Sequence, residues 1–170
     1  MHGVIVLGID PGTTATGYGV VSGDAGGRGA AGPSLVECGV IRTTSRERLG
    51  LRLSEIYEEI RSLISRHQPD ALVVEDVFYA RNVRTTVVLG HARGVVLLAA
   101  EQAGLMVHEY PPAAIKKAVV GTGAASKEQV QFMVMRLLRL KSAPQPSDAA
   151  DGVAAALAYV MTARLPRVTL

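Results

Sequence analysis

The chain has 170 residues, of which 48% are hydrophobic, and its 18 basic and 15 acidic side chains leave a net charge of +3. This composition excludes a disordered chain, and the length predicts one globular domain over residues 1–170, with 165–170 as a flexible tail. No apolar run has the length of a membrane span, no signal peptide precedes the first strand, and the single cysteine, Cys38, cannot form an internal disulfide. We therefore expect a cytoplasmic protein with no membrane partner.

Three apolar segments at the start of the chain predict an antiparallel meander of strands. Val4–Asp10 is almost continuously apolar, whereas Thr16–Ser22 alternates, and Leu35–Arg42 follows a glycine-rich stretch. That stretch, Gly23–Gly32, holds five glycines and is expected to be a mobile hairpin tip.

The rest of the chain is predicted to form helices and two further strands. Apolar residues at helical spacing predict a helix over Arg46–His67, which Pro69 ends. The later elements are expected to be a strand at Ala71–Val77, a helix at Thr86–Ala103, a strand at Leu105–Glu109, a helix at Pro111–Val120, a helix from the capping box of Ser126 and Gln129 to Leu140, and a last helix at Ser147–Arg164. This order predicts an α/β fold, in which a mixed five-stranded sheet with one antiparallel strand carries helices on both faces.

Two acidic residues end buried parallel strands, where an unpaired charge is costly. Asp10 ends the first apolar run, and Glu75 ends the run that begins at Ala71. Alternation along the strand puts Glu75 and Asp76 on opposite faces, and the continuing buried run favours Glu75 for a shared site. Because ligands of such sheets gather at the carboxyl ends of the parallel strands, we expect Asp10 and Glu75 to lie together.

Asp148 and Asp151 stand three residues apart near the start of the last helix, so they share one of its faces. Taken alone, Asp148 could simply compensate the helix dipole. The alanines around the pair would let the helix approach the sheet closely and bring both carboxylates to the strand ends. Four such carboxylates suit hard divalent cations, and two cations can drive in-line displacement at a phosphodiester.

The segment that follows Asp10 has two other interpretations. Gly12–Thr14 could be a phosphate-binding turn like that of the sugar kinase and chaperone ATPase superfamily, or a plain Asp-Pro-Gly turn. The first would make the chain an ATP-binding phosphotransferase, but that superfamily needs a second similar lobe, and a 170-residue chain without an internal repeat lacks it. A DNA-binding module with a dead site is a third alternative, against which the four intact acids argue.

Aromatic and basic residues around the acidic strand end are candidate DNA contacts. They are Phe78, Tyr79, Arg81, Arg84, Lys116 and Lys127. Phe78 and Tyr79 could stack on unpaired bases or anchor the core, and the nearby arginines favour nucleic acid. Lys116 and Lys127 flank a flexible loop at 121–123, where they could contact DNA or belong to a solvated face.

The helix predicted at Thr86–Ala103 is apolar around much of its circumference. Gly90 and Gly94 stand four residues apart in it, and glycines at this spacing allow close packing. The helix could pack on the sheet and also against a second subunit, or it could be fully internal.

These segments together resemble the RuvC family, the bacterial Holliday junction resolvases. The stretches that carry the resemblance are Gly8–Gly12, Tyr18–Val20, Glu75 with Val77 and Phe78, Ala92–Gly94, Lys116 before Val119–Gly121, Lys127–Val130 and Asp148–Asp151. Each motif is common by itself, but their order and spacing over about Val4–Arg164 are specific.

The resemblance implies a ribonuclease H-like fold and a homodimeric endonuclease that resolves four-way DNA junctions by symmetric paired nicks, in recombination and repair. It also implies work beside the RuvA–RuvB branch-migration complex. The cofactor would be Mg²⁺, for which Mn²⁺ substitutes, with two ions in each active site. The catalytic and metal-binding acids would be Asp10, Glu75, Asp148 and Asp151.

By the same resemblance, Phe78 would stack on bases, and Lys116 and Lys127 would lie near the scissile strand. Tyr79 and Arg81 depart from the common pattern of their loop, so the family's sequence preference does not transfer to this chain. Some members have histidine at the third acid, where this chain has Asp148.

Overall fold

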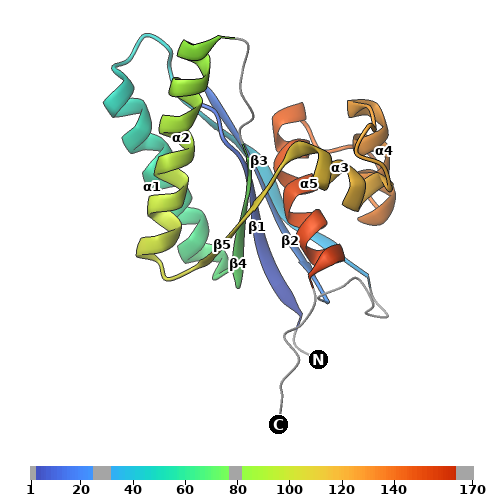
Figure 1. Cartoon of the computed structure of the whole chain (residues 1–170). Coiled ribbons are helices and arrows are strands. Elements are labelled where there is room, and N and C mark those ends of the chain that lie inside the picture. Colours follow the sequence, from blue (N-terminus) through green and yellow to red (C-terminus); the bar gives the residue numbers. More distant parts are fainter. Residues whose placement is uncertain (1–2, 25–31, 77–81, 164–170) are drawn as a thin grey trace.

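The computed structural model describes residues 3–24, 32–76 and 82–163, which form one five-stranded sheet with five helices (Figure 1). The strands are β1 (Val4–Asp10), β2 (Ala15–Gly23), β3 (Ser34–Arg42), β4 (Ala71–Glu75) and β5 (Met106–Tyr110), in the order β3-β2-β1-β4-β5. β1, β4 and β5 are parallel, and β2 is antiparallel to both of its neighbours. The predicted mixed sheet is therefore confirmed for the described residues. Most of the expected glycine-rich tip and the tail at 165–170 lie outside them.

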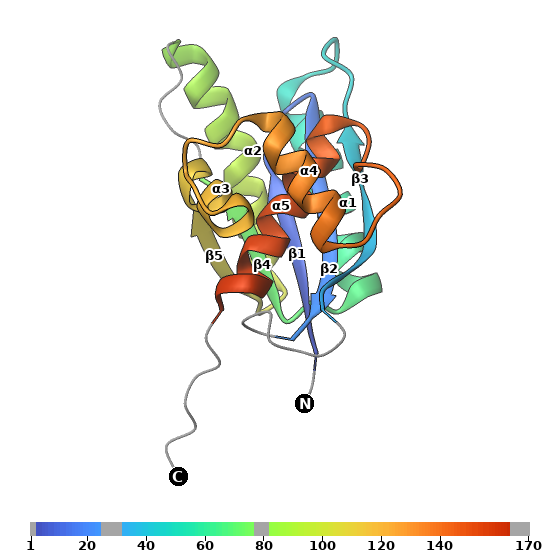
Figure 2. The same ribbon diagram turned by 90° about the vertical axis from the view of Figure 1, so that its right-hand side faces the viewer.

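Helices cover both faces of the sheet, as predicted. The helices α1 (Leu49–His67) and α2 (Val83–Gln102) lie on one face, and α3 (Pro112–Val120), α4 (Lys127–Leu137) and α5 (Ser147–Thr162) lie on the other (Figures 1 and 2). Strand alternation separates the two cores, because Leu7 and Ile9 pack with α1 and α2, whereas Val6 packs with α5. α5 contacts β1 and β2 directly, while α3 and α4 pack against α5.

Two helices are shorter than the apolar periodicity predicts. α1 begins at Leu49 and not at Arg46, because the Glu47 N–H donates to the Thr44 carbonyl at 3.0 Å and closes a turn before the helix. α4 ends at Leu137 and not at Leu140, since Arg139 adopts a left-handed φ of 54°. At the start of α4, the predicted capping box of Ser126 and Gln129 is confirmed.

α2 differs from the expectation that no segment has the length and apolar character of a membrane span. Among the described helices it alone has the length and mean hydropathy of a membrane span, by length and composition only. Ala92, Val96, Ala99 and Ala100 are buried inside the fold, where α2 contacts α1 and β5. The interpretation of α2 as a fully internal helix is wrong for this chain by itself, because Val83, Val87 and Leu98 are 78%, 54% and 51% exposed.

Candidate active site

Four carboxylates meet at the carboxyl end of the sheet, as the sequence predicted. Asp10 and Glu75 end neighbouring parallel strands, in which Ile9 is in register with Val74. One carboxylate oxygen from each of Asp10, Asp148 and Asp151 lies within 4.8 Å of the other two. Glu75 lines the same cavity as Asp10 and Asp151, with a volume of about 270 Å³.

Glycines in the sheet allow α5 to bring its two carboxylates this close. A Cβ atom on Gly17 would lie 1.8 Å from the backbone oxygen of Asp148, and one on Gly8 would lie 2.2 Å from that of Gly152. In turn, a Cβ atom on Gly152 would lie 2.6 Å from the Cα of Tyr18. Any side chain at these positions would push α5 away from the sheet, so the glycines set the spacing of the acid cluster.

The electrostatics of the cluster favour a bound cation. Burial, with the neighbouring carboxylates of Glu75, Asp151 and Asp148 acting in the same direction, raises the pKa of Asp10 to about 8. Burial and Asp151 also raise the pKa of Glu75, although the hydrogen bond with Asp10 opposes this shift. Closely spaced carboxylates repel one another, and their oxygen atoms are the ligands that a hard divalent cation takes. The cluster is therefore a suitable donor set for such a cation.

Two lysines line the cavity with the acids. The Lys127 ammonium group donates to Asp151 at 2.9 Å, and this hydrogen bond is the main cause that raises the pKa of Lys127, with burial acting against it. Lys116, on α3, lines the same cavity. The predicted pair of lysines is therefore placed beside the cluster, with Lys127 ion-paired to Asp151.

Asp76 lies outside the cluster, as strand alternation predicted. Its carboxylate pairs with Arg93 of α2 at 3.6 Å, and Arg93 also donates to Glu109 of β5. The Asp76 N–H donates to the Tyr110 carbonyl at 2.8 Å. These contacts hold the residue after Glu75 in place. The ion pair of Arg93 was not predicted from the sequence, although Arg93 lies in the Ala92–Gly94 motif.

The other predicted DNA contacts are mostly outside the described residues. Phe78, Tyr79 and Arg81 fall in the gap at 77–81, so their expected roles stay predictions. Arg84 is exposed in the first turn of α2, where its N–H donates to the Asn82 side chain at 2.9 Å.

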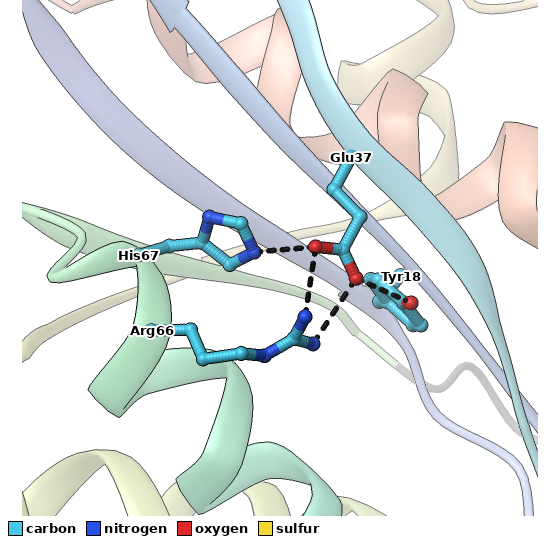
Figure 3. Close-up of polar contacts among 4 residues, drawn as sticks. All are labelled: Tyr18, Glu37, Arg66 and His67. Carbon is cyan, nitrogen blue, oxygen red and sulfur yellow. Dashed lines mark hydrogen bonds and ion pairs between the residues drawn. The ribbon is translucent and has the colours of Figure 1, made fainter.

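A second polar cluster lies on the opposite face of the sheet, under α1 (Figure 3). Glu37 accepts hydrogen bonds from Tyr18 at 2.9 Å and from Arg66 at 3.1 Å, and its other bond, to His67, is 2.7 Å. Burial acts to raise the pKa of Glu37, but these hydrogen bonds outweigh it and hold the pKa below its usual value. Every charge in this cluster is matched, which indicates a structural tie between β3 and α1.

Comparisons with known proteins agree with this geometry. Residues 6–159 match the family described as crossover junction endodeoxyribonuclease RuvC. Relatives with that description from Syntrophomonas wolfei and Moorella thermoacetica are 45% and 47% identical, covering 94% and 92% of this chain and 90% of each relative.

Solved structures give the same result. T. thermophilus RuvC in complex with a Holliday junction substrate superposes with a TM-score of 0.85 at 39% identity, covering 91% of this chain and 92% of that chain. The yeast mitochondrial Holliday junction resolvase, at 13% identity and a TM-score of 0.64 over 92% of this chain and 78% of that one, shares the fold. By the match over residues 6–159 and these identities along nearly whole chains, the chain belongs to the RuvC family of crossover junction endodeoxyribonucleases.

Proposed function

We propose that this chain resolves Holliday junctions, as a metal-dependent endonuclease that makes paired symmetric nicks in recombination and repair. The main support is the acid cluster of a RuvC-family chain, in which carboxylate oxygens of Asp10, Asp148 and Asp151 lie within 4.8 Å of one another. Glu75 lines the same cavity. A structure 39% identical to this chain is described as a complex with a Holliday junction substrate. The function also implies the cytoplasm, where bacterial DNA lies.

The acid cluster would hold the catalytic metal, which we propose to be two Mg²⁺ ions, with Mn²⁺ as a substitute. The residues that would hold it are Asp10, Glu75, Asp148 and Asp151. The donor set supports this assignment, because it consists of oxygens alone and its charges repel one another without a cation. When bound, such ions lower the pKa of a coordinated water and stabilise charge at a transferring phosphate.

The chain's own basic groups would position the scissile strand. Lys127, held by Asp151 at 2.9 Å, and Lys116 border the cavity and would bind the phosphate oxygens next to the cluster. We propose that Phe78, with Tyr79, Arg81 and Arg84, contacts bases and phosphates at the crossover, on the resemblance to the family.

The exposed face of α2 supports a homodimer. Val83, Val87 and Leu98 are more than half exposed, and Cβ atoms on Gly90 and Gly94 would meet no described atom within 4 Å. We propose that a second copy of α2 covers this face, because a two-fold dimer presents two active sites to the two-fold symmetric junction. A RuvA–RuvB complex as a further partner rests on the resemblance alone.

The ATP-binding alternative has no support. In the Gly12–Thr14 turn, the Thr14 hydroxyl accepts from Arg52 at 3.0 Å, and the Gly12 carbonyl accepts from Thr16 at 2.5 Å. The family match over residues 6–159 is to nucleases.

One experiment tests the proposed function. The protein is incubated with a synthetic four-way junction and Mg²⁺, with a linear duplex of the same sequence and a reaction in EDTA as controls. We expect paired nicks on two opposing strands of the junction and no cutting in either control. Cutting of the linear duplex at an equal rate would make the chain a general nuclease, and no cutting of the junction across several sequences would refute the proposal.

A further inference from the structure

The arginines of α1 differ in their partners between its two ends. Toward the far end of α1, Arg61 pairs with Glu58 and Arg66 with Glu37, and on α2, Arg93 pairs with Asp76 and Glu109. In the segment from the end of β3 into α1, Arg42, Arg46, Arg48 and Arg52 make no ion pair with any described residue. Four arginines within eleven residues therefore carry positive charge that no carboxylate of the described residues balances.

The segment from the end of β3 to the start of α1 lies at the end of the sheet that carries the acid cluster. Arg42 is in register with Ala15, just beyond the point where Asp10 of β1 is in register with Gly17 of β2. The start of α1 and the start of α5 lie at this same end, on opposite faces of the sheet (Figures 1 and 2). The acid cluster thus has Lys116 and Lys127 on one side and the unmatched arginines on the other.

Arg52 is held in place by neutral groups. Its Nε donates to the Thr43 hydroxyl at 3.1 Å, and one terminal nitrogen donates to the Thr14 hydroxyl at 3.0 Å. The Thr43 hydroxyl itself donates to the Thr13 carbonyl, so it can only accept from Arg52. Two of the five guanidinium N–H groups are used in this way, and the other three, with the full charge, remain for an anion.

The start of α1 adds to the positive potential. Arg48 precedes the first helical residue, no side chain of a described residue caps the N-terminus, and the first turn holds no acidic residue. Its free N–H groups favour an anion. Glu47 is the one carboxylate within 42–52, and four arginines outnumber it.

We propose that Arg42, Arg46, Arg48 and Arg52 bind the phosphate backbone of duplex DNA, on the side of the acid cluster opposite to the lysines. The inference rests on the proposed function and adds a second contact region to it. Arg52 is the fixed centre of this surface, and the exposed arginines around it contact neighbouring phosphates. Because such contacts do not distinguish sequences, the surface binds junction arms and linear duplex alike.

The test compares Arg46→Gln/Arg48→Gln with the unmodified chain and with Arg61→Gln, a control on α1 whose arginine is paired. Binding to a junction and to a linear duplex is measured in metal-free buffer at several salt concentrations. Each lost phosphate contact should lower the slope of log affinity against log salt by about 0.9, and the double variant by up to about 1.8. We expect weaker binding to both DNAs by about tenfold at low salt, and no change for Arg61→Gln. Both arginines are exposed, so the melting temperature should be retained.

The outcomes separate this inference from the proposed function. An unmodified chain that nicks junctions, with a double variant that keeps its affinity and salt slope, would overturn the arginine surface alone. Loss of affinity for the junction but not for the duplex would also overturn it, since phosphate contacts serve both. Failure of the unmodified chain to nick junctions in Mg²⁺ would instead refute the proposed function. As a second variant, Arg52→Lys keeps the charge but loses the paired donors to Thr14 and Thr43, and it should bind more weakly than the unmodified chain.

Discussion

The Cα of Gly17 faces the backbone oxygen of Asp148 so closely that a Cβ atom at position 17 would lie 1.8 Å from it. This contact joins β2 to the first turn of α5, and it sets how near Asp148 and Asp151 come to Asp10. A change of one methyl group in the sheet should therefore be felt in the acid cluster.

Gly17→Ala should destabilise the fold by about 1–3 kcal/mol, because the added methyl group overpacks the contact between α5 and β2. The increase in melting temperature on adding Mg²⁺ should also shrink, since the carboxylates move apart. Thermal unfolding with and without Mg²⁺ measures both effects. Gly50→Ala is the control, as a Cβ atom there meets no described atom within 4 Å. Equal behaviour of the two variants would contradict the packing argument.

Asp10→Asn should lower junction cleavage by about a hundredfold or more while sparing junction binding in metal-free buffer. The carboxylate holds metal, whose contribution at a phosphate is worth several kcal/mol, whereas affinity comes from phosphate contacts by basic side chains. Asp76→Asn is a matched control, because Asp76 follows the neighbouring Glu75 but pairs with Arg93 outside the cluster. Loss of binding by a folded Asp10→Asn protein would count against this division of roles.

The stability of the metal-free protein should fall as pH rises, because of Asp10. Its pKa is about 8 in the fold and near 3.8 in the unfolded chain, so the stabilising contribution of the neutral form is complete below about pH 4. That contribution is lost as pH rises through about 8, when the buried carboxylate ionises. Melting temperatures in EDTA from pH 5 to 8.5 should therefore fall more steeply for the unmodified chain than for Asp10→Asn. Parallel curves for the two proteins would refute the assignment.

Gly94→Trp should convert the proposed dimer into a monomer without unfolding it. Gly94 is exposed on α2 and a Cβ atom there meets no described atom within 4 Å, so the side chain fits the single chain but obstructs a second α2. Sedimentation at micromolar concentrations measures the assembly. Glu59→Trp, at an exposed position of α1, serves as the control for a bulky surface residue. An unmodified chain that sediments as a monomer would show that the α2 face has another role.

Phe78→Ala should keep nearly the parent melting temperature while reducing junction resolution by about tenfold or more. A stacking residue contributes about 1–3 kcal/mol of base contact, whereas a core phenylalanine replaced by alanine costs about 3–5 kcal/mol of stability. A junction with bases already unpaired at the crossover should recover part of the lost rate. A large drop in melting temperature without such recovery would assign Phe78 to the core.

The sequence by itself determined the elements and the four acids, because both depend on local patterns. Continuous apolar runs placed Asp10 and Glu75 at strand ends, and alternation along a strand separated Glu75 from Asp76 before any tertiary contact was known. The spacing of Asp148 and Asp151 needed only the period of a helix. These patterns extend over a few residues, so they can be recognised in the sequence without knowledge of the fold.

Only the tertiary structure decided which charges have partners. Arg52 reaches Thr14 across 38 residues of sequence, Lys127 reaches Asp151 across 24, and Arg93 reaches Glu109 across 16. Such pairs depend on how strands and helices pack, and a sequence window around one arginine looks the same whether its charge is matched or free. For this reason, the net charge of +3 does not reveal that the arginines beside the acid cluster lack carboxylate partners. Folding pairs Arg61 and Arg66 with carboxylates and leaves the arginines at the start of α1 without an ion pair among the described residues.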